Sequence, residues 1–563
     1  MLRRLGVVPA RVVPARVALA AIGLCGGALL AACSHIDASR PVSDAVMASM
    51  QSAATFKAVP FDSGTMATAA GCAQTSHPFS TMRCSTGDAS GPVDLSGYGY
   101  TEREFLQSGR AQVYDLGADE RAVVGSSGHR YTTRLLVRYP LDAAKFSGRV
   151  WVEIYNASSG VDLEDVWRRS WQHLMRSGDA YIGITSKSLT ADALKKFDPV
   201  RYADIQWQVA GANENGLVWD MLSQLGTQLR QPGSGGLLGT LQPKWIYLAG
   251  QSQSGFYLNT YLTAFGDRLD KAGPNGRPLF DGYLNLVGPG AMPLRSEPGV
   301  PAVSVPKTLY PATSVPQIVL MSEAESRFYG LGGAGGFPLF PPYVRRGDAD
   351  SANDKFRFYE VAGAPHSDPT SPVIPLNSEI AKAKADGSGR APKAYFAGHE
   401  ESALQLDEFV NAAIENLHAW AAQGTPAPAA QTRWIRYASA PDAKGNLVYT
   451  PLQDGVGNTL GGLRSPLIEA PLYQVLSRGK AASGSFAFDW GSMIRLSDTA
   501  INTLYGGSCA TYLKVFDAAA DTLVAERYLV RRDGEQLKAA GRTLAAQSAG
   551  GHAPIAWAGQ PCR

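Results

Sequence analysis

The clearest chemical signal in the chain is an apolar, β-type run that ends in Gly250-Gln-Ser252-Gln-Ser254-Gly255. Such a sequence fits a sharp strand-to-helix turn, a nucleophile elbow, in which a serine hydroxyl stands beside the N-terminus of a helix. The turn tolerates only small neighbours, and Ser252 is flanked by Gly250, Ser254 and Gly255. If Ser254 were the nucleophile, the bulky Phe256 would occupy one of these positions. We therefore predict that Ser252 is the nucleophile.

A serine hydroxyl is a weak nucleophile and needs a histidine base that a carboxylate orients. In elbow-type enzymes the acid follows the serine in the chain, and the histidine follows the acid. Four histidines lie beyond Ser252, namely His366, His399, His418 and His552. His366 comes directly after a strand-like run, in a turn of small residues, whereas His418 fits an amphipathic helix and the other two lie in glycine-flanked loops. We predict that His366 is the base.

Two glutamates compete for the role of the acid. The predicted strand at 317–321 runs into Ser322, Glu323 and Glu325. Because the acid is expected a few residues beyond the end of a strand, Glu325 is the predicted acid and Glu323 is the alternative. If both were solvated loop charges, His366 would lack an orienting carboxylate.

The negative charge that develops on the substrate oxygen needs two backbone donors. The first is the N–H of Gln253, directly after the serine. An apolar strand at 149–156 opens into a small polar loop, where the backbone N–H of Asn156 or Ala157 is the predicted second donor. A simple β-turn is the alternative interpretation of this loop.

The N-terminus predicts export. Four arginines precede an apolar run at 17–32 that is too short for a membrane span and fits a signal peptide. The run ends in Leu30-Ala31-Ala32-Cys33-Ser34, which resembles the lipobox of bacterial lipoproteins. This resemblance implies cleavage before Cys33, lipid attachment to Cys33 and sorting to the outer membrane. An ordinary secretory signal is the alternative.

Charge and cysteine content agree with an exported enzyme. Without the four signal arginines the chain has 48 basic and 49 acidic residues, so no excess of positive charge suggests a nucleic-acid partner. Four cysteines lie beyond the lipobox and allow three pairings, of which locality favours Cys72 with Cys84 and Cys509 with Cys562. Neither pair has metal-ligand spacing with histidine, and no phosphate-loop, dinucleotide or zinc-protease motif occurs. We predict no metal and no cofactor.

Strand and helix patterns alternate along the chain, which predicts a doubly wound, mostly parallel sheet. The predicted strands are 131–139, 149–156, 180–185, 245–249, 283–287, 317–321 and 356–361, and helical periodicity occurs at 217–229, 406–420, 497–505, 510–530 and 533–547. We expect a signal peptide at 1–32, a tether and disulfide-pinned segment at 33–96, a core at 97–424 and a packed helical extension at 425–563. Two loops rich in proline or glycine, 289–316 and 330–354, are candidate lids.

Several short motifs together carry a resemblance to a known family. They are the elbow, Val152-Glu-x-x-Asn156, the acid segment at Ser322, Glu360-Val-Ala-Gly-x-x-His366 and Gly457-Asn-x-x-Gly-Gly-x-Arg464-x-Pro466. Together they resemble bacterial α/β-hydrolase domain-containing proteins with a Gly-x-Ser-Gln-Ser-Gly elbow, over about residues 98–544. The resemblance implies the α/β-hydrolase fold and a triad of Ser252, Glu325 and His366, although aspartate is more usual at the acid position.

The sequence thus predicts an exported serine hydrolase that cleaves small carboxylic esters through an acyl-enzyme and meets the membrane only through its lipid anchor. Within enzymes, the alternatives are a feruloyl esterase, a tannase, a polyester depolymerase and a serine peptidase. A non-catalytic envelope lipoprotein with a hydrolase fold is the alternative from another class. The sequence leaves the acyl chain, the leaving group and the oligomeric state open.

Overall fold

The computed structural model describes residues 44–60, 77–80, 95–296, 305–328, 345–367, 383–384, 399–441, 443, 445, 447–478, 490–546, 554–559 and 561–562. All of them belong to one of the two units of the chain, residues 44–563. Cys33, Cys72, Cys84, His552, the signal peptide, and the parts of the two candidate lids at 297–304 and 330–344 lie outside these residues.

The central element is a ten-stranded sheet with five consecutive parallel pairings. Its spatial order is β1 (Thr55–Val59), β2 (Tyr100–Leu116), β3 (Ala122–Pro140), β5 (Ala180–Ile184), β4 (Arg149–Ile154), β8 (Trp245–Gln251), β9 (Gly282–Leu286), β10 (Gln317–Ser322), β12 (Asp354–Val361) and β11 (Ala349–Ser351). The parallel part runs from β5 to β12, and β1, β2, β3 and β11 pair antiparallel. The mostly parallel sheet predicted from the sequence is confirmed.

Apolar side chains cover both faces of the parallel strands. In β8, Ile246 and Leu248 join one hydrophobic cluster, and Tyr247 and Ala249 join another. This alternation follows from the two-residue period of a strand, and it explains why the strand is apolar throughout.

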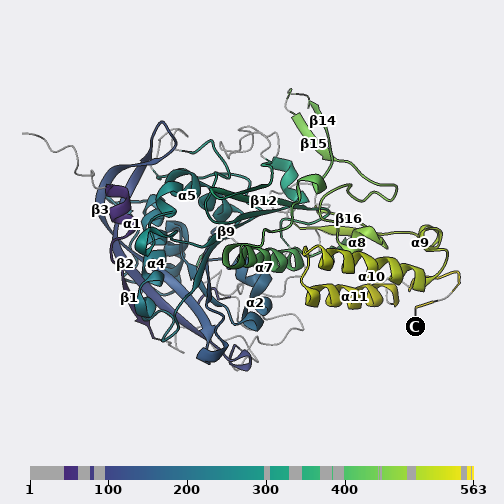
Figure 1. Ribbon diagram of the computed structural model, residues 1–563, viewed down its shortest axis with the longest axis horizontal. Helices are drawn as coiled ribbons and strands as arrows, with labels where there is room; N and C mark the ends of the chain where they lie inside the picture. The colour runs from purple at the N-terminus through teal and green to yellow at the C-terminus, as the bar shows by residue number, and fades with distance from the viewer. Residues whose placement is uncertain are drawn as a thin grey trace, which may run out of the picture. The chain divides into compact units, whose positions relative to one another are not determined.

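Helices pack on both faces of the sheet, as a doubly wound fold requires (Figure 1). The first cluster receives α1 (Ala45–Met50), α3 (Ser188–Phe197), α4 (Val218–Arg230) and α5 (Gln253–Leu269). The second receives α2 (Asp165–Ser177) and α7 (Asp407–Gln423). Helix α7 ends at Gly424 in the left-handed conformation, the C-cap that glycine favours.

The C-terminal extension packs against α7 and the end of β12. It contains α8 (Pro466–Glu469), α9 (Asp498–Tyr505), α10 (Cys509–Ala525), α11 (Arg531–Ala546) and the strands β14 (Tyr437–Pro441), β15 (Leu447–Pro451), β16 (Tyr473–Leu476) and β17 (Ser492–Arg495). Helices α10 and α11 lie side by side (Figure 1). Asn411 of α7 donates a hydrogen bond of 2.8 Å to Asp533 of α11, and Leu463 forms an isolated parallel β-bridge with Val361. The predicted packing of C-terminal helices is confirmed.

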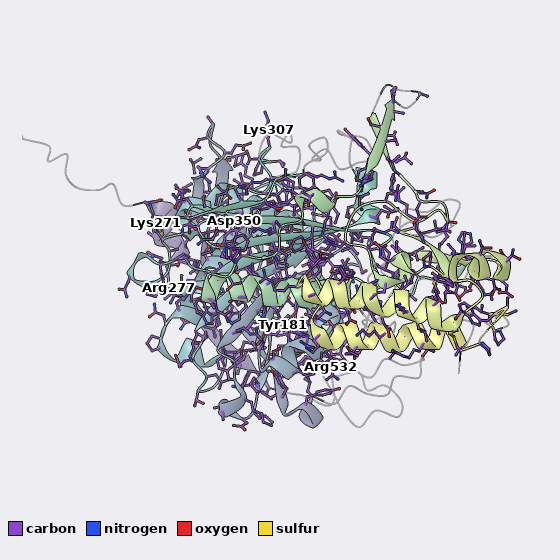
Figure 2. All side chains as sticks on the ribbon, turned by 45° about the vertical axis from the view of Figure 1, so that its right-hand side comes forward. Tyr181, Lys271, Arg277, Lys307, Asp350 and Arg532 are labelled. Carbon is purple, nitrogen blue, oxygen red and sulfur yellow. A yellow bond between two sulfur atoms is a disulfide. The ribbon has the colours of Figure 1, made fainter. Side chains whose placement is uncertain are left out.

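The start of α11 lies close to the end of α2. Arg532, labelled in Figure 2, repels Arg176 and adds to the effect of burial in lowering the pKa of Arg176. Cys509 and Cys562 form a disulfide across 53 positions of the sequence, as locality predicted. Within the described residues, no helix is both long enough and apolar enough to cross a membrane.

The long β2–β3 hairpin is the element that the sequence analysis missed most fully. The strand predicted at 131–139 is only the second half of β3, whose first half is mostly exposed from Val123 to Arg130. Exposed strands lack the apolar periodicity on which the prediction depends. The segment predicted as a tether also contains α1 and β1, and β1 pairs with β2 at the sheet edge. The short pairs β6 (Gln208–Val209) with β7 (Ala212–Asn213), and β13 (Glu400–Glu401) with β17, complete the described strands.

Candidate active site

Ser252 occupies a strained turn between β8 and α5. Its backbone has φ 54° and ψ −121°, values that a residue other than glycine seldom adopts. The small residues around it are required by space, because a Cβ at Gly250 would lie 2.5 Å from the Ser254 carbonyl oxygen and one at Gly255 would lie 2.5 Å from Asn285 Oδ1. The turn therefore has the geometry expected of a nucleophile elbow.

Ser254, the alternative nucleophile, lies inside the first turn of α5 and is fully buried. Its hydroxyl donates a hydrogen bond of 2.8 Å to the carbonyl oxygen of Tyr155 and accepts a hydrogen bond of 2.6 Å from Lys187 Nζ. Lys187 also donates 2.5 Å to the Tyr155 carbonyl oxygen, and burial lowers the pKa of Lys187 to about 7. Ser254 thus joins the elbow to the end of β4, a structural role.

His366 and the buried Glu325 form a hydrogen-bonded pair. His366 Nδ1 lies 2.6 Å from Glu325 Oε1, and the two side chains are 13% and 0% exposed. An ionised carboxylate can only accept, so the imidazole proton is on Nδ1 and Nε2 is left to act as a base. The Ser322 hydroxyl donates 3.2 Å to the same Glu325 oxygen and helps to fix its position.

Glu323, the alternative acid, has other partners. One carboxylate oxygen accepts a hydrogen bond of 2.7 Å from the N–H of Gly363, and the other accepts one of 3.1 Å from the hydroxyl of Ser477. Burial raises the pKa of Glu323. Glu323 therefore links the loop that leads to His366 with the C-terminal extension.

The other described histidines have different surroundings. His418 lies on α7 and shares a 2.6 Å hydrogen bond with Tyr247, and burial lowers its pKa. His399 Nδ1 lies 3.2 Å from the hydroxyl of Ser492, on β17. Among the described histidines that follow Ser252, His366 is the one that contacts the carboxylate of Glu325, at 2.6 Å.

The loop after β4 lies beside the elbow. Asn156 Nδ2 donates a hydrogen bond of 3.1 Å to the carbonyl oxygen of Gln251, the residue directly before Ser252. The backbone N–H of Asn156 donates 3.2 Å to Leu163, so this predicted donor is already engaged. The N–H of Ala157 has no acceptor in the described part of the chain, and the N–H of Gln253 lies in the first turn of α5, where donors lack intrahelical partners. Ala157 and Gln253 are therefore the two donors that remain.

All these residues lie at one edge of the sheet, because parallel strands present their carboxyl ends together. Asn156 follows β4, Ser252 follows β8, Glu325 follows β10 and His366 follows β12. The described residues contain no cluster of three or more potential metal ligands. The arrangement combines a serine in a strained turn, a histidine oriented by a carboxylate and two backbone N–H donors. These are the groups that acyl transfer requires.

Sequence reasoning did not find two buried cations beside the elbow, Lys187 and Arg169. Lys187 follows β5 in Thr185-Ser-Lys187, and Arg169 lies in α2 after Arg168. A basic residue inside an otherwise buried helix, or directly after a parallel strand, is the signal that could have found them.

The sequence of the chain matches a known protein family. A family model described as "Alpha/beta hydrolase domain" matches residues 59–539. A comparison with curated proteins finds no match.

Three similar solved structures are a lidless a/b serine hydrolase, XC6422, from Xanthomonas campestris, a putative dienelactone hydrolase from Klebsiella pneumoniae and the rice cell wall degrading esterase LipA from Xanthomonas oryzae. Their identities to this chain are 12%, 10% and 12%, with TM-scores of 0.21, 0.24 and 0.20. The matches cover 38%, 50% and 35% of this chain, and 72%, 94% and 45% of those chains. At these values the three proteins carry no argument about substrate.

Proposed function

The chain belongs to the alpha/beta hydrolase domain family and has the α/β-hydrolase fold, and on this premise we propose that it is a serine hydrolase that cleaves carboxylic esters. Ser252 is the nucleophile, His366 the general base and Glu325 the acid that orients His366. The N–H groups of Gln253 and Ala157 stabilise the oxyanion.

The proposed reaction has two halves. Ser252 Oγ attacks the ester carbonyl carbon while His366 Nε2 accepts the hydroxyl proton, and the carbonyl oxygen becomes an oxyanion held by the two backbone donors. Collapse breaks the bond to the alkoxy group, which leaves as an alcohol with the proton from His366. Water then attacks the acyl-enzyme with the same base, releasing the carboxylic acid and restoring Ser252. Throughout, the Glu325 carboxylate stabilises the imidazolium that forms on His366.

The observation that carries this proposal is the 2.6 Å hydrogen bond between His366 and the buried Glu325, at the same sheet edge as the strained Ser252. A fold kept only for binding has no need of a strained serine, an oriented imidazole and unpaired backbone donors together. This argument favours an enzyme over the alternative of a non-catalytic envelope protein.

A fluorophosphonate probe tests the proposal directly, because it reacts with a serine that a base activates. We expect the wild-type protein to be labelled and to hydrolyse p-nitrophenyl esters. Absence of both would favour the non-catalytic alternative. A series of chromogenic esters with rising acyl length, together with a feruloyl ester, a galloyl ester, a polyester film and a peptide amide, distinguishes the substrate alternatives.

We also propose that the protein is exported and anchored through Cys33. The Cys509–Cys562 disulfide supports an oxidising compartment, since structural disulfides are rare in the reducing cytosol. The lipobox-like sequence before Cys33 supports the anchor.

A further inference from the structure

Arg169 is a buried cation that contacts three separate segments of the site. It is 4% exposed and lies in α2. Its Nε donates a hydrogen bond of 2.8 Å to Gln251 Oε1. Its Nη2 donates a hydrogen bond of 3.1 Å to the carbonyl oxygen of His366, and its Nη1 donates one of 3.2 Å to Asp407 Oδ1. One planar guanidinium thus joins the end of β8, the histidine loop and the start of α7.

Gln251 extends this connection to the oxyanion loop. It is the last residue of β8, directly before Ser252, and its own carbonyl oxygen accepts 3.1 Å from Asn156 Nδ2. Asn156 directly precedes Ala157, the donor proposed for the oxyanion. A continuous line of hydrogen bonds therefore runs from Asn156 through Gln251 and Arg169 to His366.

We propose that Arg169 is a positioning residue that holds the nucleophile elbow, the histidine loop and the oxyanion loop at catalytic spacing. This role rests on the proposed function of Ser252 and His366. Acyl transfer is sensitive to such spacing, because a misplacement of about 1 Å can cost on the order of 100-fold in rate. The rigid fork of an arginine suits the task, since a lysine presents a single point of contact.

The energetic cost of burying the Arg169 charge supports a positioning role over a role in filling space. Burial lowers the pKa of Arg169 to about 10, and Asp407 only partly opposes that effect. An apolar side chain would fill the same space without the desolvation penalty of a buried charge. A substrate-binding role is less suitable, because Nε, Nη1 and Nη2 each already donate to a protein acceptor.

The neighbouring Arg168 offers a matched control. It lies in the same helix, its side chain is 8% exposed, and it pairs with Asp165 at 3.2 Å. In the described part of the chain, the hydrogen bonds to Gln251 Oε1 and to the His366 carbonyl oxygen come from Arg169 and not from Arg168. Arg168→Met therefore removes a buried guanidinium from α2 without touching the line of hydrogen bonds.

The experiment compares Arg169→Met, Arg169→Lys, Gln251→Leu, the double variant Arg169→Met with Gln251→Leu, and Arg168→Met. For each we measure kcat and KM on a soluble p-nitrophenyl ester, the rate of fluorophosphonate labelling, and Tm. We expect Arg169→Met to lower kcat and the labelling rate by about 100-fold with KM within about threefold. Arg169→Lys should fall between it and the wild type, and Arg168→Met should stay within about threefold of the wild type.

The double variant separates positioning from general stability. Because Gln251 acts through Arg169, the double variant should have a kcat within about threefold of Arg169→Met alone, whereas independent effects would multiply. A folded Arg169→Met protein with wild-type kcat and labelling would overturn the role, as would multiplicative losses in the double variant. If Arg169→Met does not fold, Gln251→Leu decides: a loss of about tenfold in kcat supports the role and an unchanged kcat overturns it. A wild-type protein that neither labels nor cleaves would instead overturn the proposed function itself.

Discussion

Glu323 and Glu325 are two residues apart, yet they hold different sides of the same loop. Glu325 binds the His366 imidazole at 2.6 Å, whereas Glu323 binds the N–H of Gly363, three residues before His366, at 2.7 Å. One carboxylate orients the ring and the other fixes the backbone that carries it. The two therefore make separable contributions to activity and stability.

We predict that Glu325→Gln lowers kcat by about 10³ to 10⁴-fold with little change in KM, since the carboxylate sets the imidazole tautomer and stabilises the imidazolium. Glu323→Gln should cost less than about tenfold in kcat, because its contacts are to a backbone N–H and a hydroxyl. Steady-state kinetics with one chromogenic ester measures both. A large loss only for Glu323→Gln would transfer the role to that residue, and small losses for both would place the acid elsewhere.

Lys187 should make stability depend on pH above neutrality. Burial lowers the pKa of Lys187 in the folded state to about 7, below the ordinary lysine value of 10.5, so between these values the unfolded chain binds a proton that the folded chain does not. Folding therefore becomes more favourable as pH rises through that window. Lys187→Met removes the titration, so Tm of the variant minus Tm of the wild type should be highest at pH 7 and fall towards pH 10. Thermal melts at both pH values check this, and a constant difference would contradict the lowered pKa of Lys187.

The disulfide should stabilise the C-terminal extension. Loss of one bridge that closes a loop of this size typically costs about 2–4 kcal/mol, so Cys562→Ser should lower Tm. Dithiothreitol should lower Tm of the wild type more than that of the variant, in which only the predicted Cys72–Cys84 bridge remains to be reduced. An equal effect of the reductant on both proteins would show that the bridge is not responsible.

Export can be tested in a Gram-negative host. The wild type should partition with membranes and incorporate labelled palmitate, because lipid attachment to Cys33 follows from the lipobox-like sequence. Cys33→Ser should lose both properties. Unchanged palmitate labelling in this variant would exclude Cys33 as the lipid site.

The parts of the site that could be predicted are those with local signatures. Ser252 stands out because small residues lie two positions before it and two and three positions after it, and His366 stands out because it closely follows a strand. The sequence predicted a donor in the loop after β4, but the hydrogen bond from the Asn156 N–H to Leu163 is a property of the folded loop, so the sequence could not choose between Asn156 and Ala157.

The remaining features depend on partners that are far apart in the chain. Arg169 is 197 positions from His366, and Lys187 is 67 positions from Ser254. Glu323 is 154 positions from Ser477. No periodicity or motif records such contacts, since they arise only when the strands assemble. The β2–β3 hairpin was missed for another reason. In β2 the buried polar residues Glu104 and Gln107 interrupt the apolar pattern, and the first half of β3 is mostly exposed.

The central claim is that Ser252 is an activated nucleophile and Ser254 is structural. Fluorophosphonate labelling of Ser252→Ala and Ser254→Ala, followed by peptide mapping of the labelled wild type, measures this directly. We predict that the wild type is labelled on Ser252, that Ser252→Ala is not labelled and does not cleave esters, and that Ser254→Ala keeps activity within about tenfold, because it removes no reacting group. Labelling on Ser254, or loss of activity only in Ser254→Ala, would contradict the account.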